Sequence, residues 1–217
     1  MVAILGVSAL EVQPMLRQYR SLLGATLAAF VLPLVVVPTV TARPRFPGAA
    51  VMDREAEKAI RDLSKAQYER MRAKSTPNAD GELLQLGDRL LASAQQFQQS
   101  GNHFQAKETA KAATRVYEAD RNLGGARTGQ AALSRSYFDA PFQVSRELTR
   151  TEAEIAYFRG GNPTVRDLFS RAQQLAQPAD LTAPAPTTAN VANLATNRAA
   201  VQLLKASRHL MRAQRGF

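Results

Sequence analysis

Residues 83–117 read LLQLGDRLLASAQQFQQSGNHFQAKETAKAATRVY, and they contain the clearest pattern of secondary structure in the chain. Apolar residues recur in its first half at spacings of three and four, which is typical of an α-helix buried along one side. These residues are Leu83, Leu86, Leu90, Ala94 and Phe97. Gly101 and Asn102 interrupt the pattern, and a second helix follows, whose expected buried residues are Phe104, Ala106, Ala110, Ala113 and Tyr117. Two amphipathic helices joined by a glycine turn predict an all-α protein.

Helix-forming residues dominate on both sides of this stretch, and alternation of β-branched residues is nearly absent. Helices are expected over residues 51–74, 80–100, 102–122, 139–159, 163–177 and 189–214. Asp80 is a candidate N-cap, and Asn102 with Gln105 resembles a capping box. Asp139 and Asn162 each precede a proline in the first turn of a helix, which is a favourable start.

Glycine pairs are expected to end two of these helices. Gly124-Gly125 ends the third helix, so that residues 124–137 form a loop or a short helix. Gly160-Gly161 ends the fourth helix in the same way. Residues 178–188, PADLTAPAPTT, have the composition of an extended linker.

An uncharged stretch near the N-terminus, SLLGATLAAFVLPLVVVPTVTA at residues 21–42, follows Arg17 and Arg20. It resembles a signal peptide, with a basic segment, an apolar segment and small residues before Arg43. It is also just long enough to cross a membrane as a retained anchor. A buried core helix is the third interpretation. The first two place residues 43–217 across the membrane from the basic segment.

The charge of the chain favours anionic partners. It contains 28 Lys and Arg against 18 Asp and Glu, a formal charge of +10, of which residues 43–217 hold +9. Such an excess attracts acidic proteins, lipid headgroups or nucleic acid. The absence of cysteine excludes disulfides and thiol chemistry.

Two segments, residues 83–117 and 142–178, share the order helix, glycine turn, helix. The first resembles a tetratricopeptide hairpin through Ala94, Phe97, Gly101, Ala106 and Ala113. The second offers Ala153, Gly160, Phe169, Ala172 and Pro178 at comparable positions. The turn glycines are 59 or 60 residues apart instead of the 34 of a tandem array, and tryptophan is absent. The alternative is a generic antiparallel helical bundle. The resemblance implies a concave surface that binds a protein or peptide.

No residue pattern in the chain indicates catalysis, a metal or a cofactor. His103 and His209 lack acidic or histidine neighbours at metal spacing, so we expect neither to be a ligand. Glu147, Glu152 and Glu154 gather on one expected helix, where an exposed acidic face is the simplest interpretation. We therefore expect a non-enzymatic protein without a cofactor.

The last expected helix carries a basic ridge. Arg198, Lys205, Arg208, Arg212 and Arg215 fall within an arc of about 100° on a helix. A face of small and apolar residues lies nearly opposite: Ala192, Ala195, Ala199, Leu203, Ala206, Leu210 and Ala213. The ridge is our predicted partner-binding surface, with a solvated face and an anionic lipid surface as the alternatives.

The sequence thus predicts an antiparallel helical-hairpin bundle behind a signal peptide or membrane anchor. The expected parts are the signal or anchor (1–42), a spacer (43–49), the hairpin domain (50–177), the linker (178–188) and a basic amphipathic helix (189–217). The expected function is that of an exported or membrane-anchored scaffold or accessory subunit, which binds an acidic protein of an envelope or membrane complex. The alternative is a basic helical protein that binds nucleic acid or an anionic membrane surface.

Overall fold

The computed structural model describes residues 47–129, 135–158, 162–176 and 187–216, and these residues form seven α-helices. Their bounds are α1 Pro47–Lys74, α2 Gly81–Gln99, α3 His103–Thr128, α4 Arg135–Phe138, α5 Ala140–Tyr157, α6 Pro163–Leu175 and α7 Thr188–Arg215. The described part of the chain contains no strand. The predicted all-α class is confirmed.

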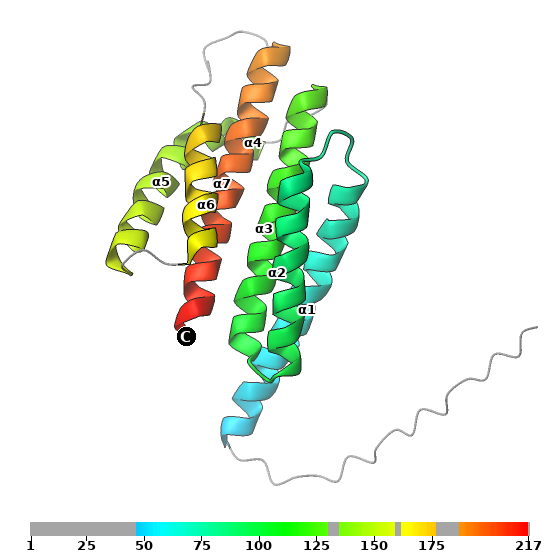
Figure 1. Cartoon of the computed structure of the whole chain (residues 1–217), viewed down its shortest axis with the longest axis vertical. Helices are drawn as coiled ribbons and strands as arrows, with labels where there is room; N and C mark the ends of the chain where they lie inside the picture. The colour runs from blue at the N-terminus through cyan, green and yellow to red at the C-terminus, as the bar shows by residue number, and fades with distance from the viewer. Residues whose placement is uncertain (1–46, 130–134, 159–161, 177–186, 217) are drawn as a thin grey trace, which may run out of the picture. The chain divides into compact units, whose positions relative to one another are not determined.

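Helices α3 and α7 form the centre of the bundle and share its most extensive contact (Figure 1). Helices α1 and α2 pack on α3, whereas α5 and α6 pack on α7. All these helices belong to one compact unit that takes in residues 44–217. The last helix is therefore a central element of the bundle, although the sequence placed it behind a linker.

Polar contacts set the register between α3 and α7, which run antiparallel. Glu108 of α3 hydrogen-bonds His209 of α7. Seven residues later in α3, Arg115 donates to Gln202, which lies seven residues before His209 in α7. Gly129, just after α3, lies against Thr188 at the start of α7. Because seven residues make about two helical turns, these contacts recur on the same side of both helices.

Buried side chains occur around most of α7, which is why it is central. The expected apolar face is confirmed for Ala195, Ala199, Leu203, Ala206, Leu210 and Ala213, all buried. Apolar residues outside that face are buried as well: Val191, Leu194, Ala200, Val201, Leu204 and Met211. A helix that buries residues on several sides needs neighbours on several sides, and α3, α5 and α6 supply them.

Of the four helix starts for which the sequence offered an N-cap residue, two have the expected side-chain hydrogen bond. Asp80 accepts the backbone N–H groups of Glu82 and Leu83, and Asn162 accepts that of Thr164. Both predicted N-caps are confirmed. Asn102 and Asp139 occupy N-cap positions but make no side-chain cap hydrogen bond, so the predicted capping box is wrong. The amide of Asn102 donates to the Ser100 hydroxyl instead.

The predicted end of the third helix at Gly124-Gly125 is also wrong. Helix α3 continues to Thr128, and Gly129, with a φ of 66°, forms its left-handed C-cap. A Cβ on Gly124 would lie 2.6 Å from Thr76 Cγ2 and 2.8 Å from the Pro77 carbonyl oxygen. This glycine therefore lets the loop between α1 and α2 approach α3 closely, and it does not end the helix.

The two expected hairpins differ in how they pack. Helices α2 and α3 meet at Gly101, whose φ of 79° favours glycine, and Ala94, Ala106 and Ala113 are completely buried. Helices α5 and α6 make few contacts with each other, because each packs on α7 instead. The described residues form a helical bundle in which α2 and α3 make a close-packed hairpin.

Several predictions fall on residues outside the described ranges. These are the signal peptide or anchor at 1–42, the Gly160-Gly161 helix end and most of the linker at 178–188. The spacer at 43–49 is shorter than expected, since α1 already begins at Pro47. Among the described helices, none combines the length and apolar character needed to cross a membrane.

Candidate functional site

The five residues of the predicted basic ridge have different environments in the bundle. Arg208 is only 8% exposed, and its Nη1 and Nε atoms donate to Glu147 at 2.8 Å and to Glu154 at 3.1 Å. Glu147 is likewise buried, at 6% exposure, which corrects the expected exposed acidic face. Arg208 is therefore not part of an exposed ridge, since it bonds α7 to α5.

A second ridge residue also has an internal partner. The guanidinium of Arg215 lies over the ring of Phe158, which follows α5 directly. Arg212 is exposed, and Arg198 and Lys205 are half-buried. Whether these residues bind a partner stays a prediction, and the structure restricts the available cations to Arg198, Lys205 and Arg212.

Arg115, on the facing side of α3, adds another cation next to this part of α7. Arg115 Nη1 donates to Glu118 at 2.7 Å and to Gln202 at 3.3 Å, and Gln202 stands between Arg198 and Lys205 along α7. Burial lowers the pKa of Lys205, and the nearby charges of Arg115 and Arg198 lower it further. Three cations thus gather on one side of the contact between α3 and α7.

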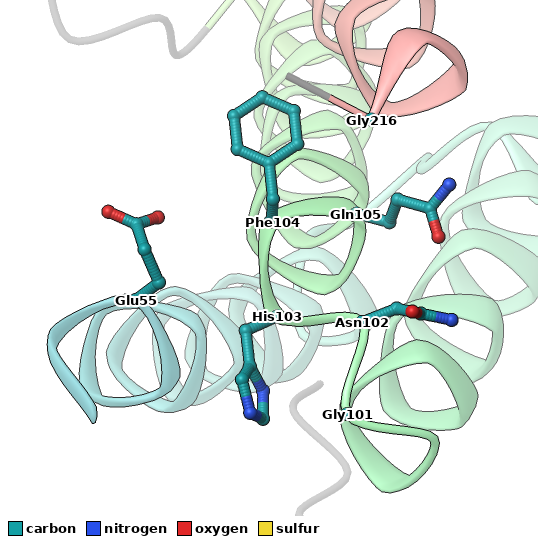
Figure 2. Close-up of a pocket in the computed structure, with 7 residues that line it drawn as sticks. All are labelled: Glu55, Gly101, Asn102, His103, Phe104, Gln105 and Gly216. Carbon is teal, nitrogen blue, oxygen red and sulfur yellow. The ribbon is translucent and has the colours of Figure 1, made fainter. Parts of the chain in front are cut away.

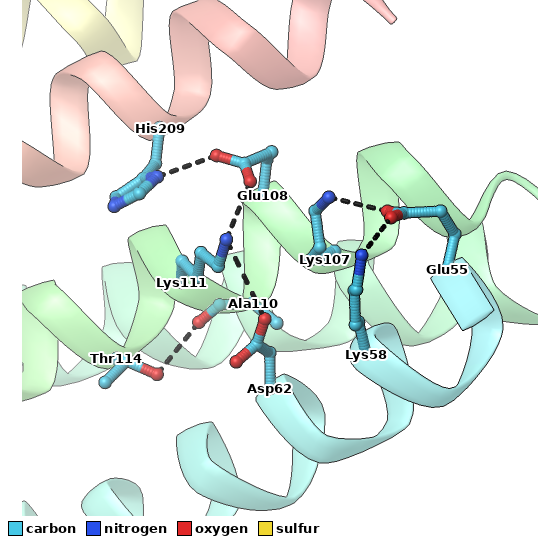
Figure 3. A network of polar contacts seen from close by, with 9 residues as sticks. All are labelled: Glu55, Lys58, Asp62, Lys107, Glu108, Ala110, Lys111, Thr114 and His209. Atoms are coloured by element: carbon cyan, nitrogen blue, oxygen red, sulfur yellow. Dashed lines mark hydrogen bonds and ion pairs between the residues drawn. The ribbon is translucent and has the colours of Figure 1, made fainter. Parts of the chain in front are cut away.

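A chain of polar contacts extends from α7 to α1 across α3 (Figure 3). His209 Nδ1 bonds Glu108 at 2.8 Å, Lys111 donates to Glu108 at 2.9 Å, and Lys111 lies 3.9 Å from Asp62. Burial lowers the pKa of His209 against the opposing effect of Glu108. Burial would raise the pKa of Glu108, but its hydrogen bonds from His209 and Lys111 prevail and lower it to about 2. At neutral pH the imidazole is therefore neutral and donates to an ionised carboxylate.

A pocket of about 370 Å³ lies at the turn between α2 and α3 (Figure 2). Glu55 from α1, His103 and Phe104 from α3, and Gly216 from the end of α7 line it. Two of its polar side chains are already engaged: Glu55 receives Lys107 at 2.6 Å and Lys58 at 2.7 Å, and His103 bonds Gln98. These lysines lower the pKa of Glu55 to about 2. The side chains of Glu55 and His103 are therefore already hydrogen-bonded within the protein.

A buried carboxylate joins α3 to the start of α2. Asp120 is completely buried and accepts the backbone N–H of Asp80. Asp80 in turn receives Arg171 of α6 at 2.5 Å and Arg127 of α3 at 3.3 Å. Burial raises the pKa of Asp120 to about 6, against the opposing effect of the Asp80 N–H. The N-cap of α2 thus rests on a carboxylate that titrates near neutrality.

Replacing Asp120 by asparagine is expected to stabilise the protein more at pH 8 than at pH 4. The folded-state pKa of about 6 lies above the usual value of 3.8, so folding favours the protonated acid. The protonated Asp120 therefore contributes to the free energy of unfolding in full below pH 3.8, and this contribution is lost as the pH rises through 6. The free energy of unfolding of Asp120→Asn, relative to that of the wild type, should therefore increase by about 2–3 kcal/mol between pH 4 and pH 8.

Urea denaturation of both proteins across this range measures that difference. Glu108, Glu55 and His209 also titrate differently in the folded state, but they are shared by the two proteins and cancel. Asparagine keeps an oxygen for the Asp80 N–H. A difference that does not change with pH would show that Asp120 does not titrate in this way.

The outer side of α1 exposes large apolar residues. Ile60 is 55% exposed, Tyr68 54% and Met71 63%, and helical geometry places all three within an arc of about 80°. We call these three residues the α1 face. A groove of about 420 Å³ between α1 and α2 adjoins it, lined by Met71, Leu91 and the Arg70–Asp88 ion pair, among others.

Sequence reasoning missed Glu108, Lys111, Arg115 and Asp120, because polar residues on a helix are expected to be exposed. The spacings of three and four among the first three were the available signal, since they follow one side of α3. Among the described residues, no group of His, Asp and Glu could hold a metal ion. Comparisons with protein-family models, with curated proteins and with solved structures found no match to this chain.

Proposed function

We propose that the chain is a non-enzymatic scaffold or accessory subunit, and that its α1 face binds another protein of an envelope or membrane complex. Residues 21–42 would export or anchor it, in accord with their uncharged sequence after two arginines. The observation that carries the binding proposal is the exposure of Ile60, Tyr68 and Met71 on one side of one helix. A set of large apolar side chains left in water is typical of a protein interaction site.

The surroundings of the α1 face support a protein as the partner. The adjoining groove between α1 and α2 has Leu91 in its lining, and such a groove can receive a protruding side chain. The Arg70–Asp88 pair in the groove, at 2.7 Å, also supplies polar groups that can orient a partner. The hairpin of α2 and α3, with its tetratricopeptide-like spacing, would hold this surface rigid.

The charge around the α1 face fits an acidic partner. Arg61, Lys65 and Arg72 are exposed, and helical geometry places them along one border of the face. The guanidinium of Arg72 lies 5.7 Å from the centroid of the Tyr68 ring. An apolar centre with a cationic border complements an apolar patch with an acidic border, which favours the correct partner and speeds association.

Photo-crosslinking in intact cells tests this proposal. A benzophenone amino acid at Tyr68 or at Met71 is expected to form an adduct with one discrete protein, since both side chains point away from the core. The matched control is the same amino acid at Gln173, which is exposed on α6. Fractionation of the same cells tests the location, through recovery of the adduct in a membrane or exported fraction.

Charge placed in the α1 face provides the second half of the test. Ile60→Asp in the Tyr68 cross-linking variant should abolish the adduct without changing the helical content, because Ile60 is 55% exposed. Equal adducts at Tyr68 and Gln173, or an adduct that survives Ile60→Asp, would contradict binding through this face. Recovery of the full-length chain in the cytosol without an adduct would favour the alternative of a basic protein that binds nucleic acid.

A further inference from the structure

Two half-buried cations on α7, Arg198 and Lys205, have no hydrogen-bond or ion-pair partner among the described residues. Arg198 and Lys205 lie two turns apart on the same side of the helix, and both are half-buried. Neither makes a hydrogen bond or an ion pair with any residue in the described ranges, which is unusual for a half-buried cation. Arg212 is also without such a partner, but its side chain is exposed to water.

The other cations near this place are neutralised. Arg208 binds two glutamates of α5, and Lys111 of α3 binds Glu108 at 2.9 Å. Where a glutamate lies close to a cation in this part of the bundle, the two form an ion pair. Arg198 and Lys205 are not paired in this way, whereas Arg215, the other half-buried cation of α7, lies over the ring of Phe158.

Arg115 brings a third cation from α3 to the same place. It donates to Gln202, the α7 residue between Arg198 and Lys205, so its guanidinium reaches across to α7 at their level. Within the described ranges, the acids whose charges act on Lys205 are Glu118 of α3 and Glu147 of α5. Glu118 is bound by Arg115, and Glu147 by Arg208. No carboxylate facing Lys205 is therefore left to neutralise it fully.

The net charge of this cluster suits one kind of anion. Arg115, Arg198 and Lys205 contribute +3, and Glu118 removes one charge, which leaves +2. A phosphate group carries about −1.5 to −2 at pH 7 and offers three acceptor oxygens. Arginine binds phosphate through a planar fork of N–H groups, and lysine contributes a compact charge. A single carboxylate would neutralise only half of this charge.

We propose that Arg115, Arg198 and Lys205 form a binding site for a phosphate group on the exposed side of the contact between α3 and α7. The phosphate comes either from free phosphate and small phosphate esters or from a lipid headgroup. Gln202 and the Arg115–Glu118 bond orient the guanidinium of Arg115 toward α7. The site uses none of the residues of the α1 face, so it is independent of the proposed protein binding.

Titration calorimetry of the full-length protein with inorganic phosphate tests the site, with sodium chloride at equal ionic strength as the blank. The double variant Arg198→Gln/Lys205→Gln is expected to lose affinity at least about tenfold, because two charge-assisted contacts are removed. Arg212→Gln is the matched control, since it removes one cation from the exposed side of the same helix. Its affinity should equal that of the wild type. Lys205→Gln alone, with circular dichroism of each protein, separates loss of binding from loss of fold.

Vesicles distinguish the two sources of the phosphate. The probe is a vesicle of phosphatidylcholine with phosphatidic acid, compared with phosphatidylcholine alone. Binding of inorganic phosphate that needs Arg198 and Lys205 supports a site for free phosphate. Binding of the phosphatidic acid vesicle alone, with the same dependence, supports a lipid headgroup. If the wild type binds neither probe better than the double variant, or if Arg212→Gln weakens binding equally, the proposed site is refuted.

Discussion

Arg208→Leu is expected to lower the free energy of unfolding by about 3–5 kcal/mol, because it leaves the buried carboxylate of Glu147 without its cation. Arg208 Nη1 lies 2.8 Å from Glu147, and the two side chains are 8% and 6% exposed. An ionised carboxylate that loses its hydrogen-bonded cation in such a place is desolvated without compensation. Urea denaturation of the full-length protein at pH 7 measures the loss.

Two further variants separate this effect from a simple loss of charge. Arg212→Leu removes an exposed cation four residues further along α7, and we expect a change within about 0.5 kcal/mol. The double variant Arg208→Leu/Glu147→Leu should regain most of the lost stability, since apolar residues can replace a buried ion pair. Glu154, 24% exposed, would then be hydrated. Equal stability of Arg208→Leu and Arg212→Leu would mean that Arg208 lies on a solvated face.

Leu204→Ala is the second substitution with a large expected effect, a loss of about 2–5 kcal/mol. Leu204 is completely buried, as is its neighbour Leu203, although the two side chains point about 100° apart on α7. A leucine buried among close-packed helices leaves a cavity when it is truncated, and the surrounding structure relaxes only in part. Because neighbours pack on α7 from several sides, both leucines should be costly to truncate.

The comparison of the two leucines tests the position of α7 in the bundle. A peripheral helix that buries only its predicted apolar face would lose stability with Leu203→Ala and hardly change with Leu204→Ala. Thermal or urea denaturation of the two variants distinguishes these arrangements. Ile60→Ala serves as the control for truncation of an exposed aliphatic residue, with an expected change within about 0.5 kcal/mol.

Part of the candidate site could be predicted from the sequence. The spacing of the five basic residues on α7 correctly placed them along one side of a helix. It could not separate Arg208, which is neutralised inside the bundle, from Lys205, which is not. That difference depends on Glu147, 61 residues away in the chain, which only the packing of α5 on α7 brings into contact. Arg115 likewise lies near Lys205 only because α3 packs on α7.

Among the features of the fold, those that depend on neighbouring residues could be predicted, and those that depend on residues distant in the chain could not. Asp80 and Asn162 could be recognised as N-caps because each bonds backbone N–H groups two or three residues further along the chain. Gly124 was misinterpreted as a helix end because its actual role, room for Thr76 and Pro77, lies 47 or 48 residues away. Glycine permits both uses, and the local sequence does not distinguish them.

The all-α class, the approximate helices and the positive charge could be read from the amino-acid sequence, since they follow from residue periodicity, propensity and composition over short distances. The central place of α7, the pairing of Arg208 and His209, and the lack of a described partner for Arg198 and Lys205 depend on how the helices pack. The physical reason is that burial and charge neutralisation depend on which helix faces which. In this bundle, residues about 60 to 100 positions apart in the chain decide those contacts.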